Sequence, residues 1–292
     1  MSQDRTVTKL ALFTQHSRHW RENRYVYPVI SRRSKGLSIG VNLNPDTVCN
    51  FDCIYCCVDR TVPAKVRDVD FDVLAAELDH MIGLAAGGEL FNQPPFDTTP
   101  PALRRLNDVA FSGDGEPTSY PHFQAACELA ARLLGRHGQT ETKTVVITNA
   151  TLLQRPAVEA ALELLDQHNG EVWAKLDAGT EPYYRKVERT SIPLQRVLDN
   201  IAACGRKRAI VIQSLFMQID GQPPSDHEID EYVQRLRELV AAGCRIKLVQ
   251  VYTVARRTAE VNVTPLPDAA LDALAEKVRA IPLEVATFYG PQ

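Results

Sequence analysis

Residues 37–56 read LSIGVNLNPDTVCNFDCIYC, in which a short apolar run is followed by three cysteines within eight residues. The run at 37–43 is apolar and β-branched, which is typical of a strand covered on both faces. Cys49, Cys53 and Cys56 have C-x3-C-x2-C spacing, so that three thiolates can converge on one metal centre. Soft thiolates suit iron–sulfur clusters or zinc. This stretch therefore predicts a buried strand followed by a metal-binding loop.

A fourth ligand is missing from this run. Cys57 follows Cys56 directly, and adjacent residues rarely converge on one centre. A structural zinc site is normally closed by a fourth Cys or His, and no C-x2-C or H-x3-H partner appears downstream. Four-iron clusters usually take four cysteines, so three would leave one iron open to an outside ligand. Buried or zinc-binding cysteines without a catalytic role are the alternative.

The composition is that of an ordinary globular protein, because 45% of the 292 residues are hydrophobic and 24% are charged. No apolar run reaches the length of a membrane span, and no signal peptide is evident at the N-terminus. Seven cysteines, an odd number, favour reduced thiols over a disulfide framework. We therefore expect a cytoplasmic protein with no membrane partner, in which Cys127, Cys204 and Cys244 are small core residues.

The charge is unevenly distributed along the chain. Residues 5–35 hold eight Lys or Arg and one acid, although the whole chain has a net charge of −3. We expect residues 1–35 to form a basic N-terminal extension and residues 36–292 to form one barrel domain. The extension either contacts phosphates or is a solvated arm that packs on the acidic body, and the sequence leaves both open.

After residue 35, apolar β-branched runs alternate with amphipathic stretches. The runs predict strands at 37–43, 108–112, 144–148, 171–176, 209–217 and 245–253. The amphipathic stretches predict helices near 71–83, 121–136, 154–167, 194–204, 226–242 and 268–280. This alternation favours parallel pairing through right-handed crossovers. We therefore predict an α/β fold, a partial (β/α)6 TIM-like barrel of parallel strands with outer helices.

Three finer expectations concern the ends and connections of these elements. Asp226 and Asp268 are candidate caps of the last two helices. The tail after residue 281 is expected to add a strand at one edge of the barrel. Residues 83–107 form a long loop rich in Gly and Pro, which is either a lid or a plain insertion.

Polar residues follow several of the predicted strands. In parallel α/β barrels the reactive groups gather at the carboxyl ends of the strands. The strand at 108–112 runs into Gly113, Asp114, Gly115 and Glu116. Glycines let the backbone approach a ligand closely, and the Glu116 carboxylate can accept from an ammonium group. A simple glycine turn is the alternative for this segment.

The later strands add further polar candidates. Asn149 and Asp177 follow two strands and can bind a polar ligand, although such residues more often complete turns. Gln213 interrupts an apolar strand, and a half-buried amide is costly unless it is bonded. It therefore faces a polar cavity or satisfies neighbouring backbone. Arg256 and Arg257 follow the strand at 245–253, where an arginine can meet a carboxylate or phosphate of a substrate; a solvated surface is the alternative.

The cysteine loop resembles that of the radical S-adenosylmethionine (radical SAM) superfamily, in which SAM chelates the open iron of a 4Fe–4S cluster. GDGEPT at 113–118 resembles the GGEP motif that holds the SAM amino group, with Asp114 replacing a glycine. Over residues 30–290 the chain is similar to a subgroup of iron–sulfur oxidoreductases related to the wybutosine-synthesis enzymes, which modify transfer RNA. Those enzymes bind a second cluster through upstream cysteines, and no cysteine precedes Cys49 here.

The resemblance implies an enzyme in which Cys49, Cys53 and Cys56 hold the cluster and Tyr55 packs near the adenine of SAM. It implies further SAM contacts from Gly113, Asp114, Gly115, Glu116, Asn149, Asp177 and Gln213. A flavodoxin- or ferredoxin-like reductant is expected as a partner. The substrate is first taken to be a transfer RNA base, with a small molecule or a glycyl-radical partner protein as alternatives. A non-catalytic zinc- or iron-binding scaffold is the hypothesis from another class.

Overall fold

The computed structural model describes Leu12 and residues 20–290 of the chain. Within that part, the main sheet has the strand order β1-β2-β3-β4-β5-β6-β7-β9, and β8 pairs with β6. The strands are β1 Val26–Ser31, β2 Gly36–Val41, β3 Leu106–Phe111, β4 Lys143–Thr148, β5 Gly170–Lys175, β6 Ile210–Ile219, β7 Ile246–Thr253, β8 Val263–Pro265 and β9 Val285–Phe288. β2 to β7 and β9 run parallel, whereas β1 is antiparallel to β2.

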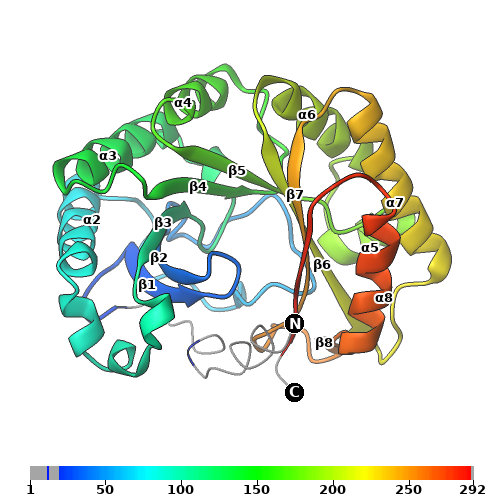
Figure 1. Cartoon of the computed structure of the whole chain (residues 1–292), viewed down its shortest axis with the longest axis horizontal. Coiled ribbons are helices and arrows are strands. Elements are labelled where there is room, and N and C mark those ends of the chain that lie inside the picture. The colour runs from blue at the N-terminus through cyan, green and yellow to red at the C-terminus, as the bar shows by residue number, and fades with distance from the viewer. Residues whose placement is uncertain (1–11, 13–19, 291–292) are drawn as a thin grey trace.

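The helices cover the outer face of this curved sheet, which forms an arch rather than a closed ring (Figure 1). They are α2 Phe71–Ala86, α3 Phe123–Arg136, α4 Pro156–Asp166, α5 Glu181–Glu188, α6 Leu194–Lys207, α7 Asp226–Ala241 and α8 Asp268–Arg279. The predicted partial barrel with parallel strands and outer helices is therefore confirmed. None of the described helices has the length and apolarity that crossing a bilayer requires.

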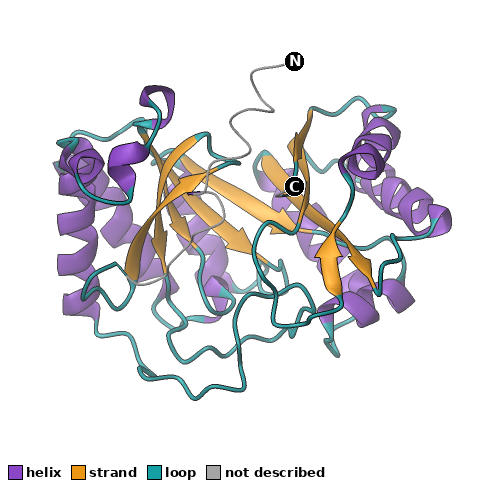
Figure 2. Ribbon diagram, turned by 90° about the horizontal axis from the view of Figure 1, so that it is seen from below, coloured by secondary structure: helices purple, strands orange, loops and turns teal. Residues whose placement is uncertain are grey.

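The buried side chains explain why the strands read as continuous apolar runs. On the outer side, the sheet and the helices share one large core. On the concave side, Ala110, Val145, Trp173 and Val211 form a small apolar layer between neighbouring strands. The strands are thus covered on one face by helices and on the other by side chains of the barrel interior. The long loops gather on one side of the molecule, at the carboxyl ends of the parallel strands (Figure 2).

The N-terminal region departs from the simplest sequence interpretation. Residues 26–31, within the predicted extension 1–35, form β1 and pair along their whole length with β2. Of the basic residues expected in the extension, Arg5, Lys9 and Arg18 lie outside the described residues. The described remainder, Arg21, Arg24, Arg32, Arg33 and Lys35, flanks β1.

The expectation for the helix caps is corrected at both residues, and the expectation of an edge strand is confirmed. Ser225, not Asp226, caps α7, because its hydroxyl accepts from the Glu228 amide. Pro267 precedes α8, so Asp268 is the first helical residue and not the cap. The predicted edge strand after residue 281 is present as β9, which pairs in parallel with β7.

The segment between α2 and β3 is packed against the fold. It contains three short 3-10 turns, at Glu89–Asn92, Phe96–Thr98 and Pro101–Leu103. Its apolar side chains, including Leu90 and Phe96, are buried in the main core. This packing favours an insertion over a lid for residues 83–107.

The three cysteines predicted to be core residues are buried: Cys127, Cys204 and Cys244. Cys244 lies directly against Gly205 of α6. A Cβ at Gly205 would lie 2.1 Å from Cys244 Sγ and 3.2 Å from Cys244 Cα. The close approach of α6 to the start of β7 therefore depends on glycine at position 205.

Gly205→Ala should lower the free energy of unfolding by about 1–3 kcal/mol, because the new methyl group overpacks this contact. Gly135→Ala is the matched control, since it is also helical but its Cβ would meet nothing within 4 Å. It should be neutral or stabilising by up to about 1 kcal/mol. Urea unfolding followed by circular dichroism measures both. In a Cys244→Ala background, Gly205→Ala should lower the free energy of unfolding by less. If it does not, the contact has been misassigned.

Candidate active site around the cysteine loop

The cysteine loop, residues 42–60, follows β2 at the carboxyl edge of the sheet. All its cysteines are free thiols; Cys49, Cys53 and Cys56 are partly buried, whereas Cys57 is exposed. Cys57 therefore differs from the other three in its surroundings as well as in its spacing.

The loop is held in place by hydrogen bonds to elements far away in the sequence. Asp52 N and Ile54 N donate to the carbonyls of Glu188 and Val187 at the end of α5, at 3.0 and 2.9 Å. Cys56 O accepts from Ala259 N, after β7, at 3.0 Å. The cysteines are thus fixed between α5 and the segment that follows β7.

Two of the thiols have polar neighbours. The Cys53 thiol donates to Glu188 Oε2 at 2.6 Å, and Arg60 Nη1 donates to Cys56 Sγ at 3.3 Å. Burial raises the pKa of Cys53 well above its ordinary value, and the Glu188 carboxyl raises it further. Burial likewise raises the pKa of Cys49. Because metals bind thiolates, a metal at Cys53 must displace this proton.

Tyr55 belongs to a buried cluster around Asp177. Its hydroxyl donates to Asp177 Oδ2 at 2.6 Å, and Lys175 Nζ lies 3.1 Å from the same oxygen. Leu215 N donates to Asp177 Oδ1 at 2.7 Å. Burial alone would lower the pKa of Lys175, but Asp177 and Tyr252 raise it above its ordinary value. Lys175 is therefore charged and forms an ion pair with Asp177.

Glu116 connects the ends of β3 and β4. Its Oε1 accepts from the hydroxyls of Thr118 and Thr148, each at 2.5 Å, and its Oε2 accepts from Asn149 N at 2.7 Å. The side chain is buried, and burial raises its pKa. The carboxylate predicted to bind an ammonium group is thus bonded to the protein framework.

Gly113 and Gly115 are required by packing around the cysteine loop. A Cβ at Gly113 would lie 2.3 Å from Asn42 Oδ1, and one at Gly115 would lie 2.2 Å from Val48 O. Asp114 joins the same contact, since Asn42 Nδ2 donates to its Oδ2 at 2.6 Å. The 113–115 segment therefore lies directly against the residues that lead to Cys49.

Asn149 continues this framework on the other side of the cysteine loop. Its Nδ2 donates to Asn50 Oδ1 at 2.7 Å, and Asn50 Nδ2 donates to Thr151 Oγ1 at 2.7 Å. The end of β4 thus positions the residue that follows Cys49.

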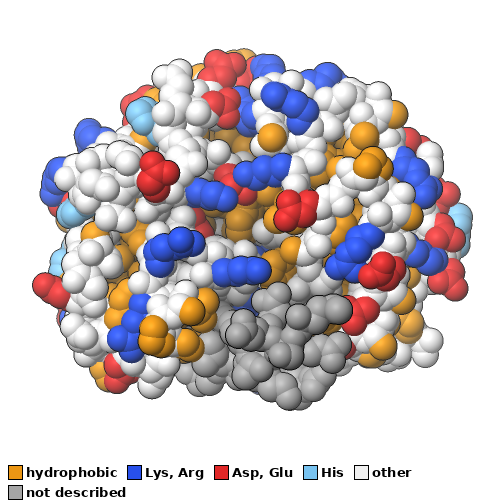
Figure 3. All heavy atoms as spheres, viewed as in Figure 1, with side chains coloured by type: hydrophobic (Ala, Val, Ile, Leu, Met, Phe, Trp, Pro, Cys, Tyr) orange, Lys and Arg blue, Asp and Glu red, His pale blue; other side chains and the backbone are white. Residues whose placement is uncertain are grey.

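A cavity of about 280 Å³ occupies the barrel interior below the loop. The predicted residues that line it are Tyr55, Cys56, Gly113 and Gln213. The other predicted residues do not line the cavity: Cys49, Cys53, Asp114, Gly115, Glu116, Asn149 and Asp177. In the space-filling view, Lys and Arg side chains surround a central hollow (Figure 3).

Gln213 has a distinctive position in this cavity. It is fully buried, and its Nε2 donates to Gln250 Oε1 at 2.8 Å. Its own Oε1 has no hydrogen-bond partner in the described structure. The sequence left open whether this amide faces a cavity or satisfies backbone, and the structure supports the cavity.

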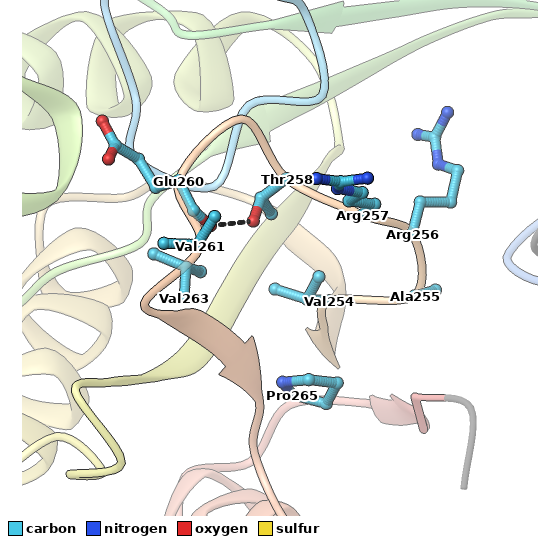
Figure 4. Close-up of a pocket in the computed structure, with 9 residues that line it drawn as sticks. All are labelled: Val254, Ala255, Arg256, Arg257, Thr258, Glu260, Val261, Val263 and Pro265. Carbon is cyan, nitrogen blue, oxygen red and sulfur yellow. Dashed lines mark hydrogen bonds between the residues drawn. The ribbon is translucent and has the colours of Figure 1, made fainter.

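A second, larger pocket of about 580 Å³ is formed by the segment after β7 (Figure 4). It lies within residues 254–265, where Thr258 Oγ1 donates to Glu260 O at 2.6 Å. Arg256 and Arg257 leave this segment in different directions. Arg256 also lines the interior cavity, whereas Arg257 does not.

The thiols are not arranged around a single ion. Among the described residues, no group of three or more Cys, His, Asp or Glu side chains is placed to hold one metal ion. A closed zinc site would therefore require the loop to move. In an iron–sulfur cluster each thiolate binds a different iron, so the cysteines need not converge on one point.

Comparison with known proteins extends these observations. No protein-family model matches the chain. A UPF0026 protein of Helicobacter pylori is 30% identical over 60% of this chain and 49% of its own length. The chain spans about half the length of the UPF0026 proteins it matches.

Among solved structures, a radical SAM methyltransferase from Sphaerobacter thermophilus has a TM-score of 0.61 at 13% identity, covering 90% of this chain and 68% of that chain. SuiB of Streptococcus suis, bound to S-adenosylmethionine, has a TM-score of 0.56 at 17% identity, covering 88% of this chain and 52% of that chain. At these identities the similarity is one of fold.

Glu116→Gln should lower the free energy of unfolding by about 1–3 kcal/mol, because its amide group cannot accept from all the donors that face the carboxylate. Urea unfolding of protein free of metal and SAM measures the effect. Glu163→Gln, on the exposed side of α4, is the control and should stay within about 0.5 kcal/mol of wild type. Unchanged stability for Glu116→Gln would refute the framework role.

Proposed function

We propose that this protein is a radical SAM enzyme in which Cys49, Cys53 and Cys56 hold a 4Fe–4S cluster. The observation that carries the proposal is a C-x3-C-x2-C loop at the carboxyl ends of parallel strands, with Cys56 in the wall of an interior cavity. Its fold similarity to radical SAM enzymes supports this proposal.

The residues around the cysteine loop fit a 4Fe–4S cluster that binds SAM. Three soft thiol donors lie on one loop, and none is in a disulfide. The buried acceptor Gln213 Oε1 has no protein partner in the described structure, so the cavity offers a polar contact to a ligand. When bound, a reduced cluster would supply the one electron that breaks the S–C5′ bond of SAM, giving methionine and a 5′-deoxyadenosyl radical that would abstract hydrogen from a substrate.

The protein's own residues bind and position the reactants. We assign direct SAM contacts to Tyr55, Gly113 and Gln213, because these predicted residues line the cavity together with Cys56. Asp114, Gly115, Glu116, Asn149 and Asp177 act by positioning the loop and the strand ends. The Lys175–Asp177 pair fixes the hydroxyl of Tyr55 and thereby orients its ring.

The substrate and the electron donor complete the proposal. A flavodoxin- or ferredoxin-like protein would supply electrons, and the hydrogen donor is a transfer RNA base or a small molecule. The interior position of the cavity favours a small molecule, because only a group that enters the barrel can reach it. A glycyl-radical activase would instead need a broad docking face for its partner protein.

Anaerobic reconstitution with iron and sulfide should give a brown protein with about four irons per chain. After reduction it should cleave SAM to 5′-deoxyadenosine. Metal analysis and chromatography of the products measure both. About one zinc per chain, with no iron or sulfide retained, would favour the non-catalytic scaffold.

Cys53→Ala should abolish SAM cleavage and lower the iron content, because one iron loses its ligand. Cys57→Ala is the matched control and should retain both, since Cys57 is exposed and, although it also lines the cavity, is not one of the proposed iron ligands. Circular dichroism checks that each variant is folded. If Cys57→Ala is inactive and Cys53→Ala is active, the ligand set has been assigned incorrectly.

A further inference from the structure

The wall of the interior cavity is strongly cationic. Its lining includes four cationic side chains and one carboxylate, Asp108. The cations come from separate parts of the chain: Arg32 and Arg33 from the β1–β2 turn, Lys175 from β5 and Arg256 from the segment after β7. The fold therefore gathers positive charge from three places around one enclosed space.

The three arginines have no carboxylate in ion-pair contact within the part of the chain that the structure describes. Among the described residues, no acid lies within 4.0 Å of the guanidinium of Arg32, Arg33 or Arg256. Arg32 donates to the carbonyl of Tyr289. Burial, together with the positive charges of Arg33 and Arg256, lowers the pKa of Arg32 to about 10. Like charges are thus held together in a partly buried place without neutralisation.

The single carboxylate does not balance this charge. Asp108 is buried on β3 and accepts from the Ser38 hydroxyl. Burial raises the pKa of Asp108, whereas the Ser38 hydrogen bond and the positive charge of Arg33 act in the opposite direction. Lys175 is already neutralised by Asp177. Among the described lining residues, one carboxylate, Asp108, thus faces three arginines that have no ion-pair partner.

Arg33 lies against aromatic side chains of β5 and β7 inside the barrel. The guanidinium of Arg33 stacks over the rings of Tyr252 and Trp173, at 4.9 and 5.9 Å from their centroids. Trp173 precedes Lys175 by two residues on β5, and Lys175 lies against Tyr55 of the loop. An anion held by Arg33 would therefore lie beside Tyr252 and close to the proposed SAM site at Tyr55.

We propose that this cavity binds a small anionic substrate whose carboxylate or phosphate is held by Arg32, Arg33 and Arg256. Arginine suits this role because its planar fork of donors matches both kinds of anion. The reaction at this substrate rests on the proposed function, whereas the binding of the anion does not.

The test titrates the full-length, cluster-free protein with inorganic phosphate and with acetate at constant ionic strength. The readout is tryptophan fluorescence, because Trp173 lies beneath Arg33. The protein has two tryptophans, and Trp173→Phe should remove the response. Arg33→Gln and Arg256→Gln should each weaken binding about tenfold, or roughly 1.4 kcal/mol.

Arg257→Gln is the matched control, since it removes the same charge from an exposed neighbour that does not line the cavity. The Arg257→Gln variant should bind the anion with the wild-type affinity, within about twofold. Arg33→Lys keeps the positive charge but loses the planar set of guanidinium donors, so this variant should bind the anion with intermediate affinity. Circular dichroism confirms that the variants are folded.

The outcomes separate the sources of the anion. Saturable binding of phosphate alone indicates a phosphorylated substrate, and saturable binding of acetate alone indicates a carboxylic acid. No saturable binding of either, or an equal loss in Arg257→Gln, overturns the proposal. Loss of anion binding in the presence of saturating SAM also overturns it, because the arginines would then bind the cofactor's carboxylate. Failed SAM cleavage with intact anion binding would refute only the proposed enzyme.

Discussion

Three buried carboxylates determine how the carboxyl ends of the strands are held together: Glu116, Asp177 and Glu188. An unpaired carboxylate in such a place costs several kcal/mol, so each must find donors. Glu116 accepts a hydrogen bond from Thr148 at the end of β4. Asp177 accepts from Tyr55 and pairs with Lys175, and Glu188 accepts from the Cys53 thiol. Two of these partners, Tyr55 and Cys53, lie on the cysteine loop. The position of the loop therefore follows from the need to satisfy charges that belong to the barrel.

Most of the barrel could be predicted from the sequence, because alternating apolar runs and amphipathic stretches leave few arrangements other than parallel strands with outer helices. β1 was missed because its short apolar run, VYPVIS, lies among the basic residues that suggested a solvated arm. α5 was missed because EPYYRKVE contains few apolar residues. Its position depends on tertiary contacts, such as those of its carboxyl end with the cysteine loop.

The composition of the candidate site was predictable, but the arrangement of its side chains was not. Parallel strand ends meet at one edge, so the cysteines, Glu116 and Asn149 were expected to be neighbours, and hydrogen bonds link them through Asn50. Which of these side chains faces the cavity depends on donors contributed by other strands. The Glu116 carboxylate is bonded to the end of β4 because the Thr148 hydroxyl donates to it. Arg256 was already a candidate substrate contact in the sequence, but its grouping with Arg32 and Arg33 was hidden, since these residues are more than two hundred positions away from it.

The open side of the arch is bridged by the hydrogen bond between Arg32 and the carbonyl of Tyr289, residues 257 positions apart. Contacts between such distant segments form late, since closing a long loop costs entropy before the contact compensates it. During synthesis on the ribosome, the first hairpin emerges long before β9. The pocket that Arg32 helps to enclose is therefore completed only when the last strand has left the exit tunnel.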